Sequence, residues 1–242
     1  MSVDVKISSR WNIICDFDGT IAPTDVTDHL LERFADPAWL QIERAWQAKE
    51  ISSRHCLMQQ TEMLSMTAGE LLESLADIPI DPAFVDFVAF AQSRDCGVQV
   101  ASEGYAQAIR TLLGRAGAMP LAIASTYLIA NGADRWMLGC PFARPNCRSV
   151  AATCKCAVAG QGVTAGARTL LIGDGRSDFC LAARADFVFA RGALLDYCRQ
   201  RHLPHAPVGN FVDAQQQLVE LLAMDMRSNN GVLAEARVQR HG

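Results

Sequence analysis

The stretch WNIICDFDGTIAP, residues 11–23, runs from apolar residues into two aspartates and then into a Gly-Thr turn and a proline. Residues 13–15 predict a short buried strand, because they are apolar and are followed directly by turn residues. Residues two apart in a strand share a face, so Asp16 and Asp18 are expected to point the same way at the strand's end. Two neighbouring carboxylates repel each other unless a cation or a shared proton relieves them. The stretch therefore predicts a metal site.

The composition is that of a globular enzyme-sized chain. The 242 residues are 50% hydrophobic and 20% charged, which is enough to bury a substantial core. The sequence shows neither an export signal nor an apolar run long enough to cross a membrane, so a cytoplasmic location is expected. A net charge of −4 gives no indication of nucleic-acid binding. The oligomeric state is left open.

Two regions differ in their periodicity. Residues 24–78 carry apolar residues at three- and four-residue spacing in four segments, for which Thr24, Ser52 and Thr67 are candidate N-caps. Outside that region short apolar strands alternate with helices. The strands are expected at residues 12–16, 97–102, 121–125, 169–174 and 187–191, and the helices between them at 82–95, 105–116 and 177–184. A hairpin turn is expected at Asn131-Gly132.

This alternation predicts an α/β fold, a Rossmann-like parallel sheet with helices on both faces, together with a small helical cap inserted after the first strand. The core domain is expected to comprise residues 1–22 and 80–225, and the helical cap residues 23–79. The polar residues 226–242 are expected to form a mobile tail.

The expected strand ends carry polar chemistry. The second strand ends in Ser102, Glu103 and Gly104, and a later one ends in Asp174, with Asp178 four residues beyond. The carboxyl ends of parallel strands gather along one edge of a sheet, where ligands bind. Lys155, at the start of an expected helix, falls between these two strands in the sequence.

These residue types match phosphoryl transfer through an aspartyl-phosphate. Asp16 is the candidate nucleophile, because a carboxylate needs no activating base, and Asp18 is the candidate general acid and base. Mg²⁺ is the expected cofactor, since it prefers oxygen ligands. Its expected ligands are the carboxylates of Asp16 and Asp174 and the backbone carbonyl of Asp18, with Asp178 orienting its waters or Lys155.

The phosphate itself is expected to be bound by a hydroxyl, an amide and an ammonium. Ser102 and the amide of Gly104 are candidates to bond the non-bridging oxygens, and Lys155 to supply positive charge. Glu103 would repel a phosphate, so it is expected to point outward and receives no role.

In order along the chain, DFDGT, ASEG, Lys155 and IGDGRSD resemble the four motifs of the haloacid dehalogenase superfamily of phosphatases. The position of the helical segment is similar to that of the cap in the phosphoserine phosphatase branch. ICDFDGTI, FVAF, IGDGRSDFCLA, FVFAR and NFVDA further resemble the bacterial 2-hydroxy-3-keto-5-methylthiopentenyl-1-phosphate phosphatases of methionine salvage. The resemblance implies a small phosphorylated metabolite as substrate.

Asp25 and Arg54 are the candidate substrate-reading residues near or on the cap. Asp25 stands where phosphoserine phosphatases have a glutamate that meets the substrate amine, and Gly19 replaces the serine of their DxDST motif, so methionine salvage is favoured over phosphoserine. Phosphoserine phosphatase or another small-metabolite phosphatase is the alternative. A phosphomutase also stays open, whereas Asp18 argues against a dehalogenase and the intact motifs argue against a non-catalytic binding module.

Nine cysteines without an export signal are expected to be reduced thiols. Four of them, Cys140, Cys147, Cys154 and Cys156, lie close together in the sequence and could suggest zinc. Their spacing contains no C-x2-C pair, so small buried or partly exposed thiols are the commoner interpretation.

Overall fold

The computed structural model describes residues 11–161 and 166–238, and its strands form one seven-stranded sheet. Neighbouring strands pair in parallel except β3 and β4, which form the expected hairpin around Asn131-Gly132. In spatial order the strands are β4 (Trp136–Gly139), β3 (Ala122–Ala130), β2 (Gly97–Tyr105), β1 (Trp11–Cys15), β5 (Arg168–Gly173), β6 (Phe187–Ala190) and β7 (His205–Pro207). The predicted α/β sheet is confirmed, with β1 near its centre.

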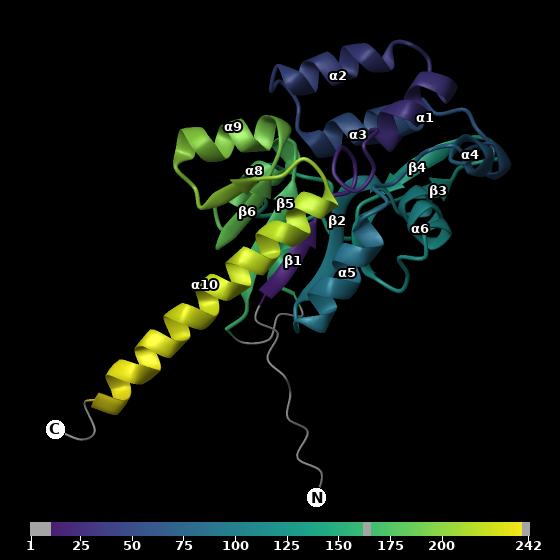
Figure 1. Cartoon of the computed structure of the whole chain (residues 1–242). Coiled ribbons are helices and arrows are strands. Elements are labelled where there is room, and N and C mark those ends of the chain that lie inside the picture. The colour runs from purple at the N-terminus through teal and green to yellow at the C-terminus, as the bar shows by residue number, and fades with distance from the viewer. Residues whose placement is uncertain (1–10, 162–165, 239–242) are drawn as a thin grey trace, which may run out of the picture.

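Helices cover both faces of this sheet (Figure 1). Their bounds are α1 Val26–Phe34, α2 Trp39–Gln47, α3 Ser53–Glu62, α4 Ala68–Ser74, α5 Phe84–Ser93, α6 Ala106–Arg115, α7 Lys155–Ala159, α8 Phe179–Ala182, α9 Gly192–Arg201 and α10 Phe211–Val238, with a 3₁₀ turn at Arg176–Asp178. Ile13 packs on the face covered by α5 and α10, whereas Ile14 packs on the face covered by α7, α8 and α9. This two-residue alternation explains why the central strands are apolar throughout.

The four helices expected in residues 24–78 are present, and two of their three predicted caps are confirmed. The Ser52 side chain accepts a hydrogen bond from the His55 amide, and Thr67 forms a capping box with Glu70. The prediction for Thr24 is wrong: Asp25 caps α1 by accepting from the Asp28 amide. An aspartate is at least as good an N-cap as threonine.

Helices α1 to α3 lie above the carboxyl ends of the strands, and α4 lies beside α6 (Figure 1). They share one hydrophobic core with the sheet, because Leu30, Leu31 and Leu64 belong to the same buried cluster as Ile13. The Trp136 indole on β4 donates to the Met66 carbonyl at 2.8 Å. The helical segment is therefore joined both to β1 and to the hairpin.

The C-terminal part of the fold is the part that the sequence predicted least well. Helices α9 and α10 and the short strand β7 were not expected, and α10 continues through Val238 where a tail was expected to begin at residue 226. The Trp11 indole donates to Asp225 at 2.8 Å, which fixes α10 against β1. Residues 1–10, 162–165 and 239–242 of the predicted domains lie outside the described residues.

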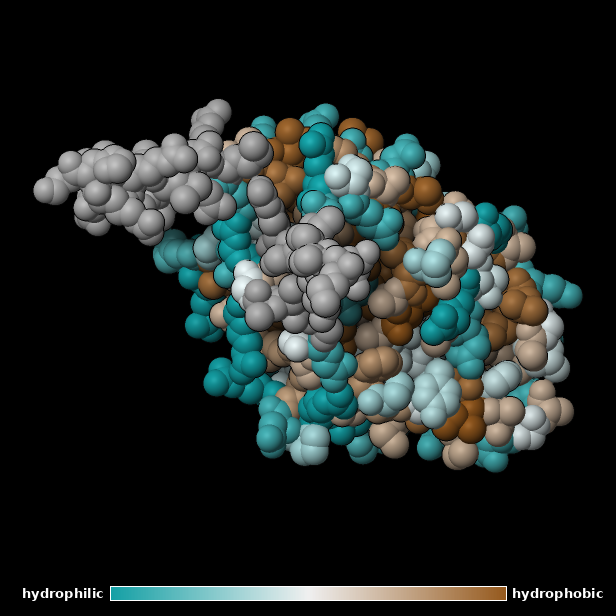
Figure 2. Space-filling view, turned by 90° about the horizontal axis from the view of Figure 1, so that it is seen from below, coloured by the Kyte–Doolittle hydropathy of each residue, from teal (hydrophilic) through white to brown (hydrophobic). Residues whose placement is uncertain are grey.

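Within the described ranges, no helix combines the length and the apolar character that crossing a bilayer requires. Figure 2 shows the molecule from the side away from α1 to α3, where hydrophobic residues alternate with hydrophilic ones.

Candidate active site

Asp16 and Asp18 lie just after β1 and line one cavity of about 190 Å³. The Asp16 amide donates to the Ile172 carbonyl of β5 at 2.9 Å, so the chain is still held in the sheet as it reaches the nucleophile candidate. The Asp18 carboxylate accepts from the Val26 amide at 2.8 Å and from the Ser102 hydroxyl at 3.4 Å. Burial, and then the charge of Asp25, raises the pKa of Asp18 well above its usual range.

Gly19 makes the turn after these aspartates possible. Its φ is +68°, and a Cβ added there would lie 2.4 Å from the Asp174 carboxylate. Only glycine combines this backbone conformation with such a close approach. The turn therefore brings the end of β1 directly against the acid at the end of β5.

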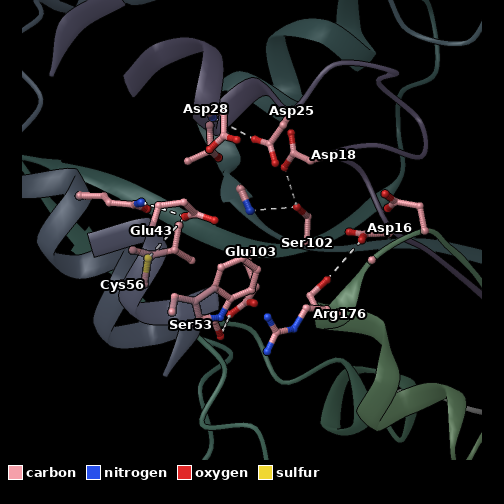
Figure 3. A pocket seen from close by; sticks show the side chains of 18 residues that line it. Asp16, Asp18, Asp25, Asp28, Glu43, Ser53, Cys56, Ser102, Glu103 and Arg176 are labelled. Atoms are coloured by element: carbon pink, nitrogen blue, oxygen red, sulfur yellow. Dashed lines mark hydrogen bonds between the residues drawn. The ribbon is translucent and has the colours of Figure 1, made fainter. Parts of the chain in front are cut away.

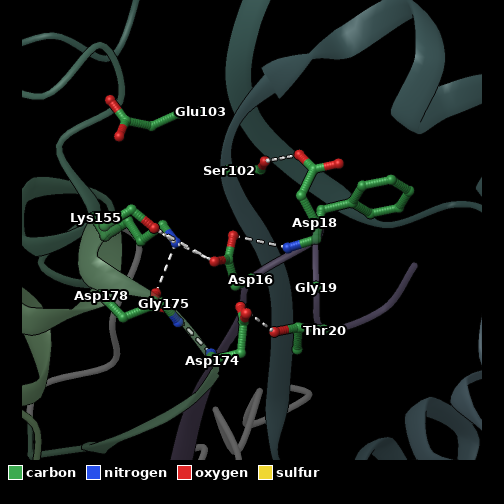
Figure 4. A network of polar contacts seen from close by, with 12 residues as sticks. Asp16, Asp18, Gly19, Thr20, Ser102, Glu103, Lys155, Asp174, Gly175 and Asp178 are labelled. Atoms are coloured by element: carbon green, nitrogen blue, oxygen red, sulfur yellow. Dashed lines mark hydrogen bonds and ion pairs between the residues drawn. The ribbon is translucent and has the colours of Figure 1, made fainter. Parts of the chain in front are cut away.

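Lys155 is the first residue of α7 and is buried, with 3% of its surface exposed. Its ammonium lies 2.8 Å from Asp16 and 2.6 Å from Asp178, and donates to the Ser177 hydroxyl at 3.0 Å (Figure 4). Burial opposes the charge of Lys155, but the two carboxylates outweigh this effect and raise its pKa. The structure thus joins Lys155 to Asp16 of the DFDGT motif and to Asp178 of the IGDGRSD motif.

Asp16, Asp174 and Asp178 form a group of oxygen ligands. One carboxylate oxygen from each lies within 4.8 Å of the others. Asp174 accepts from the Thr20 hydroxyl at 3.1 Å, and the fully buried Asp178 also bonds weakly to the amides of Asp174 and Gly175, both at 3.3 Å. Burial, and then the charge of Asp16, raises the pKa of Asp178 to about 8. Three hard oxygen donors in this arrangement fit Mg²⁺.

The end of β2 is irregular at the ASEG motif, and this irregularity turns its side chains toward the cavity. The register with β3 shifts between Ala101 and Tyr105, as at a β-bulge, which re-aims side chains at a strand end. Ser102, which is 1% exposed, lines the cavity and accepts from the Gly104 amide at 2.9 Å. The amide expected to meet phosphate is thus bonded to the Ser102 hydroxyl here. A Cβ on Gly104 would lie 2.5 Å from the Asp18 carboxylate.

The prediction that Glu103 points outward is wrong. It lines the cavity, where its carboxylate accepts from the Ser53 hydroxyl of α3 at 3.0 Å and from the Ala152 amide at 2.6 Å. Burial raises its pKa. Both donors are about 50 residues away in the sequence, so no local signal could have revealed this contact. Glu103 joins β2 to α3 and to the loop before α7.

The two substrate-reading candidates occupy different places. Asp25 lines the cavity at the start of α1, as the sequence suggested. Arg54 does not line it, because its guanidinium donates to the Ala151 carbonyl at 2.9 and 3.2 Å. Arg54 therefore holds the loop before α7, and nothing in its contacts places it near a substrate.

The cavity also contains residues that the sequence did not single out. Asp28 of α1, Glu43 of α2 and Arg176 line it (Figure 3), as do Trp46 of α2 and Gln60 of α3. Burial, and then the charges of Asp25, Glu43 and Glu32, raises the pKa of Asp28 to about 7. Asp25 is the N-cap of α1 and Asp28 lies three residues later in its first turn, and this cap spacing was the available signal.

The cysteines are free thiols in the structure. The Cys156 and Cys180 sulfurs lie 3.4 Å apart, and Cys147 contacts the Ser149 hydroxyl at 3.3 Å. Within residues 11–161 and 166–238, the one group of three or more possible metal ligands consists of aspartates. The suggestion of zinc bound by cysteines therefore gains no support.

Comparison with known proteins agrees with this geometry. A family model described as haloacid dehalogenase-like hydrolase matches residues 13–183. A 2-hydroxy-3-keto-5-methylthiopentenyl-1-phosphate phosphatase of Exiguobacterium sp. (strain ATCC BAA-1283 / AT1b) is 29% identical, over 84% of this chain and 94% of that relative. The phosphatase of the same name from Geobacillus kaustophilus (strain HTA426) is 28% identical, over 83% of this chain and 92% of that relative.

Solved structures share the fold at low identity. A phospho-aspartyl intermediate analogue of phosphoserine phosphatase superposes with a TM-score of 0.67 at 16% identity, covering 88% of this chain and 99% of that one. Phosphoserine phosphatase from T. onnurineus gives a TM-score of 0.67 at 11% identity, and the match covers 89% of this chain and 97% of that one.

Proposed function

Because the chain belongs to the haloacid dehalogenase-like hydrolases, we propose that it is a magnesium-dependent phosphomonoesterase that works through an aspartyl-phosphate on Asp16. The observation that carries the proposal is the contact of Asp16 with Lys155 at 2.8 Å, beside Asp174 and Asp178. A buried carboxylate that is held by an ammonium in a metal-type acidic group matches the requirements of a phosphoryl acceptor.

The chain's own residues would perform the following steps. The Asp16 carboxylate attacks phosphorus, and Asp18 protonates the departing alcohol oxygen. Asp18 then removes a proton from the water that cleaves the acyl-phosphate, which restores Asp16 and releases phosphate. Lys155, 2.8 Å from Asp16, would supply positive charge and Ser102, which lines the cavity, would supply a hydroxyl to stabilise the phosphoryl oxygens.

Asp16 and Asp174 would hold the metal through carboxylate oxygens, together with the backbone carbonyl of Asp18. Asp178 bonds Lys155 directly, so its role is to position that ammonium as well as to complete the acidic group. Magnesium bound there would neutralise the acids and the phosphate and would polarise the phosphoryl oxygens.

We further propose that residues 23–79 act as the cap of a core made from residues 1–22 and 80–225. Three of their helices lie above the strand ends, and Asp25, Asp28 and Glu43 from them line the cavity. A cover of this kind excludes bulk water from a reactive acyl-phosphate. It also places cap side chains next to the alcohol part of the substrate.

The substrate is a small phosphorylated metabolite, as the modest cavity and the names of the relatives favour. The relatives make 2-hydroxy-3-keto-5-methylthiopentenyl-1-phosphate the first candidate, in a cytoplasmic methionine-salvage reaction. Phosphoserine, or another small phosphate ester, is the second candidate, favoured by the phosphoserine phosphatases among the structures of similar fold.

The function is tested with Asp16→Asn, Asp18→Asn and, as control, Asp77→Asn, which alters an exposed aspartate outside the cavity. Hydrolysis of p-nitrophenyl phosphate in magnesium should be lost in Asp16→Asn, because an amide cannot form the acyl-phosphate. Asp18→Asn should lose about 10²–10⁴-fold in turnover. The control should match the wild type.

The covalent step has its own readout. Intact-protein mass spectrometry of Asp18→Asn after incubation with substrate should show the added mass of one phosphoryl group, and Asp16→Asn should show none. A turnover of Asp16→Asn above about one hundredth of the wild-type value would exclude covalent catalysis by this residue. The loss would then be smaller than the roughly 10²–10⁴-fold that acid–base catalysis alone contributes, and removal of a nucleophile must cost more than that.

A further inference from the structure

Two free thiols lie in contact on the segments that carry Lys155 and Asp178. The Cys156 thiol of α7 donates to the Cys180 sulfur of α8 at 3.4 Å, and both side chains are partly exposed. Cys156 directly follows Lys155, and Cys180 lies two residues after Asp178. Lys155 and Asp178 are themselves joined by an ion pair (Figure 4). A bond between the two sulfurs, which we call the dithiol, would therefore link the same two segments a second time.

One sulfur of the dithiol faces a second cavity, of about 760 Å³, which adjoins the cavity beside Asp16 and shares Arg176 and Ser177 with it. Cys180 lines this second cavity, whereas Cys156 does not. Basic side chains outnumber acidic ones in its lining, which includes Lys49, Arg148, Arg176 and Arg184 against Glu50 and Glu103. Reactive cysteines are typically partly exposed and surrounded by basic groups, and Cys180 meets both conditions.

The two thiols differ in their surroundings. Cys156 is the donor in the contact between the sulfurs, and burial, followed by this hydrogen bond, raises the pKa of Cys156 to about 12. Cys156 therefore keeps its proton, and its sulfur is reached through Cys180. Cys180 is placed to meet a small reagent first, and Cys156 is placed to react with the product.

A second pair of thiols provides an internal comparison. The side chains of Cys147 and Cys154 also form a hydrogen bond. Both residues are buried, and neither lines either cavity. A reagent that enters through the second cavity should therefore reach the dithiol before it reaches Cys147 or Cys154.

We propose that the dithiol is a site of reversible oxidation by a hydroperoxide, and that the resulting disulfide displaces Lys155 from Asp16. The Cys180 sulfur attacks a peroxide oxygen and the O–O bond breaks. The leaving oxygen takes the proton that Cys180 gave up and departs as water or an alcohol, and Cys180 becomes a sulfenic acid. The Cys156 sulfur then attacks Cys180, the S–S bond forms, and the sulfenic oxygen leaves with the Cys156 proton as water. The two thiols lose two electrons, which the hydroperoxide accepts.

The position of Lys155 explains why this bond should slow hydrolysis, a consequence that rests on the proposed phosphatase function. Two bonded sulfurs lie closer together than two thiols in contact, so forming the bond draws α7 and α8 together. Lys155 is the first residue of α7, and its ammonium lies 2.8 Å from Asp16 and 2.6 Å from Asp178. A misplacement of about 1 Å in an active site can cost about 10²-fold in rate.

The test exposes the protein in magnesium to hydrogen peroxide, removes the excess with catalase, and measures both the bond and the activity. Proteolytic digestion and mass spectrometry should find Cys156 linked to Cys180, and turnover of p-nitrophenyl phosphate should fall at least tenfold. Dithiothreitol should restore the turnover. It reduces a disulfide but neither methionine sulfoxide nor a sulfinic acid, so recovery assigns the loss to the disulfide.

Single substitutions locate the effect. Cys156→Ser and Cys180→Ser each remove one sulfur of the dithiol, so neither should show a loss of turnover that dithiothreitol restores. Cys140→Ser, which changes a partly exposed thiol outside both cavities, should respond to peroxide as the wild type does. A reversible loss in Cys156→Ser or Cys180→Ser equal to that of the wild type would overturn the inference.

The inference would also be overturned by absence of the Cys156–Cys180 link, by a link between Cys147 and Cys154 in its place, or by full turnover of completely linked protein. If the reduced protein hydrolyses no ester, the phosphatase proposal fails separately and lysine acetylation still decides. Lys155 is buried and Lys49 is exposed. Acetic anhydride should label Lys155 several-fold more in oxidised than in reduced protein, with Lys49 labelled equally in both. Equal labelling of Lys155 would show that the disulfide does not displace it.

Discussion

Asp28 combines partial burial with acidic neighbours on its own helix and on α2. Its pKa of about 7 results from burial first and then from Asp25, Glu43 and Glu32. An unfolded aspartate titrates near pH 3.9, so the folded chain binds the Asp28 proton more tightly. Stability that comes from this proton is therefore fully present below about pH 4 and is lost as the pH rises toward about 7.

Asp28→Asn should accordingly be more stable than the wild type at about pH 8 and of equal stability near pH 4. The expected gain at the higher pH is about 1 kcal/mol, a modest figure because solvent screens a half-exposed carboxylate. Urea denaturation at both pH values, in magnesium-free buffer with chelator, measures it. A gain of the same size at both pH values would show that the amide acts through something other than charge.

Residues at strand ends were the ones that sequence could predict. Asp16, Asp18 and Asp174 lie at or just beyond the ends of apolar strands, so their convergence needs only the topology of a parallel sheet. Glu103 also follows such a run, yet its orientation depends on Ser53 and Ala152, which only the folded chain brings to it. The contact of Arg54 with the Ala151 carbonyl was beyond prediction for the same reason.

At the scale of elements, the Glu103 carboxylate connects β2, the N-terminus of α3 and the loop before α7. The Ser53 bond joins the predicted cap to the core, and the Ala152 bond fixes the segment that leads to Lys155. Losing one hydrogen bond to a charged group costs about 1.5–3 kcal/mol. Removing the Glu103 carboxylate should therefore first cause local opening of the segments that it holds.

Glu103→Ala should increase amide hydrogen exchange at residues 150–154 and at the start of α3, whereas Ser53→Ala should increase it at α3 alone. The difference follows because Ser53→Ala leaves the Ala152 bond in place. Hydrogen exchange with mass spectrometry measures both, with Glu62→Gln as control. Unchanged exchange at residues 150–154 in Glu103→Ala would show that other contacts, such as those of Arg54, hold that loop.

The elements followed from periodicity where their apolar pattern was strong, whereas the longest helix, α10, was not predicted. The helices of residues 24–78 and the central strands were predicted because apolar spacing differs between helix and strand. Strand β7, His205–Pro207, has three residues and contains no apolar alternation, so the neighbouring β6 determines its conformation. Helix α10 was not predicted, and its polar residues beyond 225 were expected to be a tail, since polarity alone resembles a tail.

At the scale of the whole molecule, the acidic group beneath the cavity opposes folding when no cation is bound. Asp16, Asp174 and Asp178 approach within 4.8 Å, and Lys155 neutralises only part of their charge. A ligand that binds the folded chain alone stabilises it by mass action, by about 2.7 kcal/mol at a hundred times its Kd. Magnesium should therefore stabilise the entire fold, independently of any substrate.

In a chain of this size each kcal/mol raises Tm by about 2–4 °C. Saturating magnesium should therefore raise the Tm of the wild type by roughly 5–10 °C at the same multiple of Kd. Asp174→Asn should lose most of this increase while folding normally, because the site then lacks one of its carboxylates. Asp77→Asn should retain the increase in Tm, which removes general charge effects as an explanation.

Scanning calorimetry at constant ionic strength, with sodium chloride balancing the magnesium salt, measures the shift in Tm. An equal shift in Asp174→Asn would show that the stabilising cation binds elsewhere on the molecule. The metal assignment on which the phosphatase proposal depends would then be wrong.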